Sequence, residues 1–102
     1  MVFRLHKVLA PHADDLRHLT DLICDSKSHD DPPFHHFTSQ DLLIKIGNSI
    51  YKSTKAGSEE FERLWKEVAF VTGESHIYLE DVYRSLLETR PVDVRFHDLH
   101  FM

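Results

Sequence analysis

One segment of this sequence has both a helical pattern and clear ends. Between Ser58 and Gly73, apolar side chains recur every three or four residues, which places them on one face of a helix. Serine is favoured just before a helix, and glycine just after one, because glycine adopts a positive φ without strain. The segment therefore predicts an amphipathic helix that buries one face against other elements. That face carries Phe61, Leu64, Trp65, Val68 and Val71.

Three further segments show the same periodicity. One runs roughly from Pro11 to Asp25, where the proline suits a first helical turn. Another begins at Thr38, with Asp41 three residues later as a capping box, and continues through DLLIKIGNSIYKS. The last runs roughly from Ile77 to Glu88 and is stopped by Arg90-Pro91. Since stripes joined by a short turn must face each other, we expect six side chains to be buried together: Leu64, Trp65, Val68, Leu79, Val82 and Leu86.

The remaining segments predict a loop and two strands. In the stretch Ser26 to His36, the pair Pro32-Pro33 forbids helix. Val92 to Phe101 alternates apolar and polar residues, and Val2 to Val8 does so less cleanly. A lone short strand is unstable, so we expect these two segments to pair. The predicted fold is mostly α (α+β), a compact four-helix domain with a small two-stranded sheet formed by the N- and C-terminal segments.

Composition indicates one soluble domain over residues 1–102. Hydrophobic residues make up 41% and charged residues 28%, which are ordinary values for a globular protein. The apolar runs are far shorter than the roughly 20 residues of a membrane span. Cys24 is the only cysteine, which favours a reducing compartment, and we expect a cytoplasmic protein. Because Cys24 lies beside the apolar stripe of its helix, near the C-terminal end, we expect a buried structural thiol.

The chain is acidic and rich in histidine. Its formal net charge is −5 with nine histidines counted as neutral. An acidic balance argues against non-specific binding to nucleic acid or to anionic lipid, because both require a positive surface. We expect no membrane association.

The last two predicted helices also match a helix-turn-helix pattern. A small residue at the helix crossing, a glycine in the turn and two buried aliphatic residues fall at the required spacing. The second helix would then read the DNA major groove through His76, Tyr78 and Arg84. Glu80 and Asp81, near its start, would meet phosphate unfavourably. The pattern residues are Ala69, Gly73, Leu79 and Val82.

Residues suited to metal binding or catalysis do not form a known motif in this sequence. His29, His35 and His36 have the right ligand chemistry for zinc, but neighbouring histidines on an irregular loop rarely reach one ion. No HExxH, paired CxxC, GxSxG or glycine-rich phosphate loop occurs. We therefore expect no metal site, no cofactor and no enzymatic activity.

Association with another protein remains as the favoured function. Three aromatic residues have no evident place in the core, and aromatic residues are enriched in interface cores. One face of the first predicted helix is acidic and would suit a basic partner. We expect a small regulator, inhibitor or assembly subunit that binds a protein partner or a second copy of itself, with DNA binding as the alternative. The candidate partner-binding residues are Phe34, Phe70, Phe101, Asp14, Asp21 and Asp25.

Overall fold

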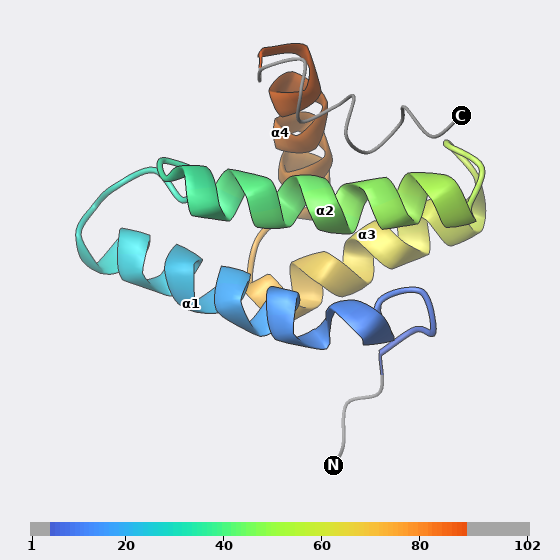
Figure 1. The fold of residues 1–102 in the computed structure, drawn as a ribbon, viewed down its shortest axis with the longest axis horizontal. Coiled ribbons are helices and arrows are strands. Elements are labelled where there is room, and N and C mark those ends of the chain that lie inside the picture. Colours follow the sequence, from blue (N-terminus) through green and yellow to red (C-terminus); the bar gives the residue numbers. More distant parts are fainter. Residues whose placement is uncertain (1–4, 90–102) are drawn as a thin grey trace.

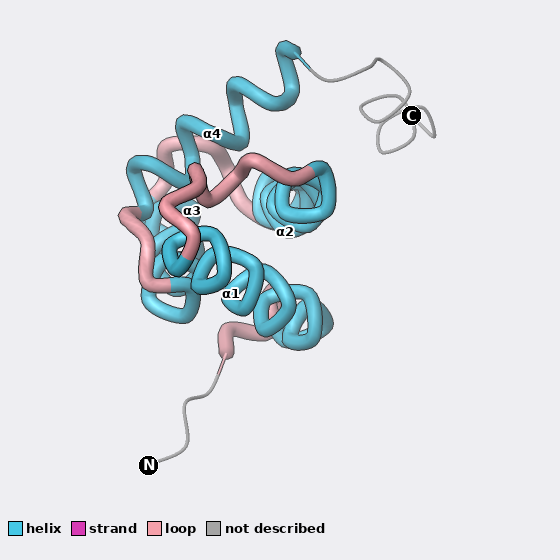
Figure 2. Tube along the Cα trace, turned by 90° about the vertical axis from the view of Figure 1, so that its left-hand side faces the viewer, coloured by secondary structure: helices cyan, strands magenta, loops and turns pink. Residues whose placement is uncertain are grey.

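A computed structural model describes residues 5–89 of the chain. In chain order they form a single 3-10 turn and four α-helices (Figure 1). Figures 1 and 2 show α1 and α2 side by side, with α3 behind them and α4 crossing α2 steeply. The elements are η1 (Ala10–His12), α1 (Ala13–Ser28), α2 (Phe37–Ser53), α3 (Glu59–Thr72) and α4 (His76–Thr89).

Local hydrogen bonds explain where α3 begins and ends. Ser58 Oγ accepts a hydrogen bond from the Phe61 N–H at 3.2 Å, which satisfies one free donor of the first turn. Gly73 has a φ of 80°, and its N–H donates to Ala69 O. Both predicted ends are therefore confirmed. By contrast, α2 begins at Phe37 after the extended residue His36, and no side chain caps it, so the predicted start at Thr38 was wrong.

The core forms where the apolar faces of the four helices meet. Trp65 is 1% exposed and Tyr83 is 2% exposed, and their ring centroids lie 5.6 Å apart. Of the six residues predicted to be buried together, Val82 is only partly buried, and the other five are buried. The stripes of α3 and α4 therefore face each other as their periodicity predicts.

Helix α2 packs against all three other helices. This position explains why α2 buries residues on several of its sides, Ile44 and Gly47 among them. Although α2 is apolar on several sides, it has only 17 residues. Within residues 5–89, no helix has the length and apolar character that crossing a membrane requires.

The predicted two-stranded sheet is wrong. Leu5 to Val8 leads by a turn into η1, and no strand occurs in residues 5–89. His6 organises this turn: its carbonyl accepts from the N–H groups of Leu9 and Ala10, and its Nδ1 accepts from Val8 N–H. These local bonds use the backbone groups that strand pairing would need. The partner segment, Val92 to Phe101, lies outside the described residues.

Candidate protein-interaction site

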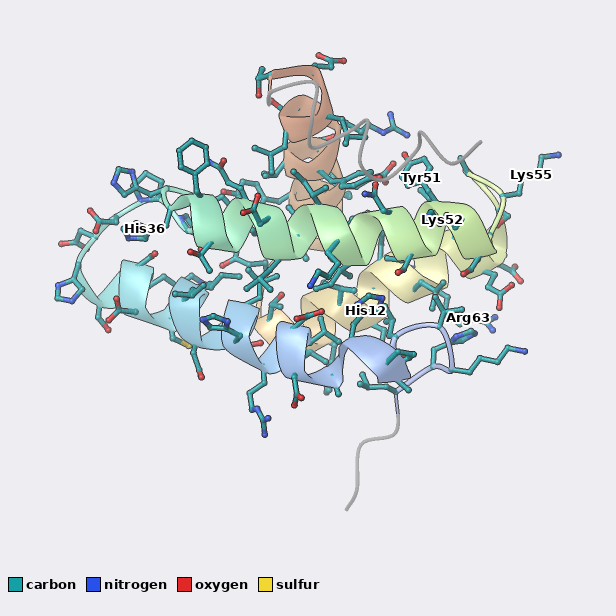
Figure 3. All side chains as sticks on the ribbon, in the orientation of Figure 1. His12, His36, Tyr51, Lys52, Lys55 and Arg63 are labelled. Carbon is teal, nitrogen blue, oxygen red and sulfur yellow. The ribbon has the colours of Figure 1, made fainter. Side chains whose placement is uncertain are left out.

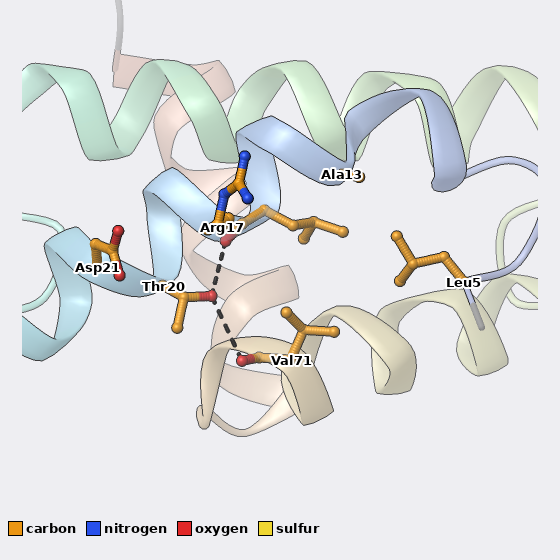
Figure 4. Close-up of a pocket in the computed structure, with 7 residues that line it drawn as sticks. Leu5, Ala13, Arg17, Thr20, Asp21 and Val71 are labelled. Atoms are coloured by element: carbon orange, nitrogen blue, oxygen red, sulfur yellow. Dashed lines mark hydrogen bonds between the residues drawn. The ribbon is translucent and has the colours of Figure 1, made fainter. Parts of the chain in front are cut away.

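A hollow of about 290 Å³ opens to the surface between α1 and α3 (Figure 4). Leu5 closes one end and Asp21 lies at the other. We call this feature the α1/α3 groove. It is lined by Leu5, Ala13, Leu16, Arg17, Thr20, Asp21 and Val71.

The single hydroxyl in the groove is already satisfied. Thr20 Oγ1 donates to Leu16 O at 2.7 Å and also lies 3.4 Å from Val71 O, so it links α1 to α3 (Figure 4). A polar group that is satisfied internally does not require a ligand hydrogen bond. Apart from the charged residues Arg17 and Asp21, the rest of the lining is aliphatic, which makes the α1/α3 groove suited to an apolar side chain.

The rim of the groove on α1 is acidic. Asp14 forms an ion pair with Arg17 at 2.7 Å, in which both side chains are largely exposed. Asp25 lies 3.6 Å from His29, a contact that becomes an ion pair only when the imidazole is protonated. Asp21 has no cationic side chain within ion-pair distance in residues 5–89. The predicted residues Asp14, Asp21 and Asp25 thus share one side of α1.

The three aromatic residues predicted to bind a partner have different positions. Phe70 is 73% exposed and precedes Val71, which lines the groove. Phe34 is 9% exposed and belongs to the core, where its ring centroid lies 6.1 Å from that of Tyr78. Phe101 lies outside the described residues. Of the two aromatic candidates within the described residues, Phe70 is therefore the one with an exposed ring.

An ion pair connects α1 to the turn between α3 and α4. Lys27 Nζ lies 2.6 Å from Glu74 Oε2, and this hydrogen bond is the main reason that the pKa of Lys27 is raised from 10.5. Burial is the main cause that raises the pKa of Tyr78 from 10.0, and the nearby Glu74 carboxylate adds to it. The Lys27–Glu74 ion pair therefore joins the α3–α4 corner to α1.

The α3–α4 corner turns at Gly73, which has a positive φ, with Ala69 and Leu79 buried on either side, but its candidate DNA-reading residues are engaged internally. Arg84 Nη2 lies 2.7 Å from Glu80 Oε2. The hydrogen bond that Arg84 Nε donates to Tyr51 Oη is the first cause that raises the arginine pKa. His76 Nε2 lies 4.0 Å from Glu62, and Tyr78 contacts Phe34. A cation already paired with a carboxylate is poorly placed to bind phosphate.

The histidines of the first loop lie apart from the groove. The rings of His35 and His36 meet edge to face at 5.0 Å, while His29 lies beside Asp25. No group of three metal-binding side chains occurs in residues 5–89. His12 instead joins two helices: its Nε2 lies 2.6 Å from Ser49 Oγ on α2, and its Nδ1 lies 3.2 Å from Asp15 (Figure 3).

Cys24 is exposed, so the predicted buried thiol was wrong. It follows Ile23, which points to the core, and one residue turns the side chain by about 100° around the helix. Ser26, three residues after Ile23, lies on the same side of α1 as Ile23 and is buried, whereas Cys24 is not.

Sequence reasoning missed most of the residues that line the α1/α3 groove. Asp21 was identified by its charge, whereas Leu5 was assigned to a strand, Val71 was assigned to the core, and Ala13 and Thr20 were not singled out. Val71 is only partly buried although it lies on the apolar stripe of α3, and this incomplete burial is visible only in the folded chain. No protein family model, curated protein or solved structure matches this chain.

Proposed function

We propose that this chain is a non-enzymatic protein-interaction module that takes an apolar side chain of a partner into the α1/α3 groove. Such a module acts as a regulator, an inhibitor or an assembly subunit. The single exposed thiol of Cys24 is compatible with the reducing environment of the cytoplasm, where we place it.

The observation that carries this proposal is a largely apolar hollow that opens to the surface between α1 and α3. Leu5, Leu16 and Val71 supply the apolar lining. At about 290 Å³ the hollow is at the lower limit for small-molecule sites, which favours a protruding side chain as its occupant. Phe70 on α3 is 73% exposed, and aromatic residues are enriched in protein interfaces.

A peptide library displayed on phage tests this proposal. Peptides selected on the native protein are measured against Ala13→Trp, which fills the groove from an exposed position at the start of α1. We expect the variant to lose at least tenfold in affinity. The control is Ala56→Trp, an equal change at an exposed loop position outside the groove. Equal binding to both variants, or failure to select any peptide, would reject the groove as the site.

DNA binding through the α3–α4 corner is the second candidate, supported by the left-handed Gly73 in the turn. Fluorescence anisotropy with random-sequence duplex DNA at low salt tests it. A DNA-binding protein would lose affinity steeply as salt rises, and Arg84→Ala would weaken it further. Because Glu80 already holds Arg84, we expect no binding under these conditions.

A further inference from the structure

The geometry points to a basic amphipathic helix as the partner of the α1/α3 groove. This inference rests on the proposed function and adds the chemistry of the partner. An aliphatic side chain of the helix enters the hollow, and lysine or arginine residues one turn apart meet Asp21 and Asp25.

The ion pairs within the protein leave these two carboxylates available. Other charged side chains of α1 already form ion pairs: Arg17 pairs with Asp14, and Lys27 pairs with Glu74. Asp15 lies 3.2 Å from the His12 ring and 3.9 Å from Lys45. Asp21 has no cation within ion-pair distance in the described part of the chain, and Asp25 meets only a histidine. The unbalanced charge of α1 therefore lies on this stripe.

The spacing of the two carboxylates defines the form of the partner. Asp21 and Asp25 are four residues apart on α1, which separates them by about 6 Å along the helix axis. Basic residues at positions i and i+4 of a partner helix have the same separation. Asp21 also lines the hollow. A helix with its basic residues next to an aliphatic one thus matches both features at once.

Two synthetic helical peptides test this inference directly. Both carry leucines along one face; one has lysines flanking that face and the other has glutamates at the same positions. Fluorescence anisotropy with the full chain gives both affinities. We expect the lysine peptide to bind at least tenfold more tightly, and the difference to shrink as salt rises.

Variants connect the charge preference to the proposed residues. Asp21→Asn with Asp25→Asn should weaken the lysine peptide about fivefold, the size expected for two exposed ion pairs. Asp31→Asn with Asp81→Asn removes the same charge from exposed positions off α1 and should leave its affinity unchanged. Ala13→Trp should abolish binding of both peptides.

The other possible outcomes would reject either the basic partner or the groove. Equal affinities for the two peptides would refute the basic partner, while loss of both in Ala13→Trp would keep the groove as the site. Binding that appears only after removal of residues 1–4 would make the chain's own N-terminus the occupant. If the mass in solution doubles as the protein concentration rises, and Ala13→Trp restores the monomer mass, the occupant of the groove is a second copy of the chain. If neither peptide binds while phage-selected peptides do, the groove function stands and the basic helix is rejected.

Discussion

The aromatic ring of Tyr83 lies so close to Gly47 that a β-carbon on the glycine would overlap two ring carbons. This contact brings α4 onto α2, and the Tyr83 hydroxyl donates a hydrogen bond to Asn48 Oδ1 on the same helix. Glycine in the middle of a helix costs about 1 kcal/mol relative to alanine. The close approach of α4 explains why glycine is nevertheless found there.

Gly47→Ala should destabilise the protein by about 1–3 kcal/mol, although alanine is the better helix former. The added methyl group forces the Tyr83 ring to move in a closely packed core. Urea unfolding measures the loss. In a Tyr83→Ala background the same substitution should be neutral or stabilising, and an equal loss in both backgrounds would show that the ring is not the cause.

Trp65→Ala should cost about 3–5 kcal/mol, enough to unfold much of a domain of this size. Trp65 is 1% exposed and lies among Phe61, Tyr83 and neighbouring aliphatic residues. Trp65→Phe should cost clearly less, because it keeps a ring and removes an indole N–H that has no hydrogen-bond partner in residues 5–89. Equal losses in the two variants, measured by urea unfolding, would contradict this ranking.

Stability should fall as the pH rises above about 10. The folded state raises the pKa of Lys27 and of Tyr78, so the folded chain keeps both protons to a higher pH than the unfolded chain. Their stabilising effect is complete below the ordinary values of 10.5 and 10.0, and it is lost at higher pH. Melting temperatures between pH 8 and about 11 should fall less steeply in Glu74→Gln. Lys66→Met, which changes an exposed lysine of α3, serves as the control.

The purified protein should retain no stoichiometric metal, and a chelator should leave its melting temperature unchanged. Binding to the folded state alone would add stability that chelation removes. His35 and His36 face each other edge to face, and His29 lies beside Asp25. Elemental analysis that finds about one zinc ion per chain, lost in His35→Ala with His36→Ala, would overturn this prediction.

The predictions that proved right depend on interactions close in sequence. Ser58 and Gly73 mark the ends of α3 through hydrogen bonds that span three or four residues, and residue preferences report such bonds directly. Leu5 was assigned to a strand because its turn depends on His6, whose ring and carbonyl accept bonds that no alternation pattern reveals. The α1/α3 groove was not predictable, because it needs Leu5, Leu16 and Val71, which come from three separate segments.

Leu5 at one end of the groove determines how this protein should be labelled. A label attached at Leu5 itself would compete with any occupant of the hollow. The end of α4 lies on the opposite side of the molecule from the N-terminal end of the described chain (Figure 1). Fluorophores and surface-immobilisation groups attached to an exposed residue of α4, such as Glu88, should therefore leave the hollow open.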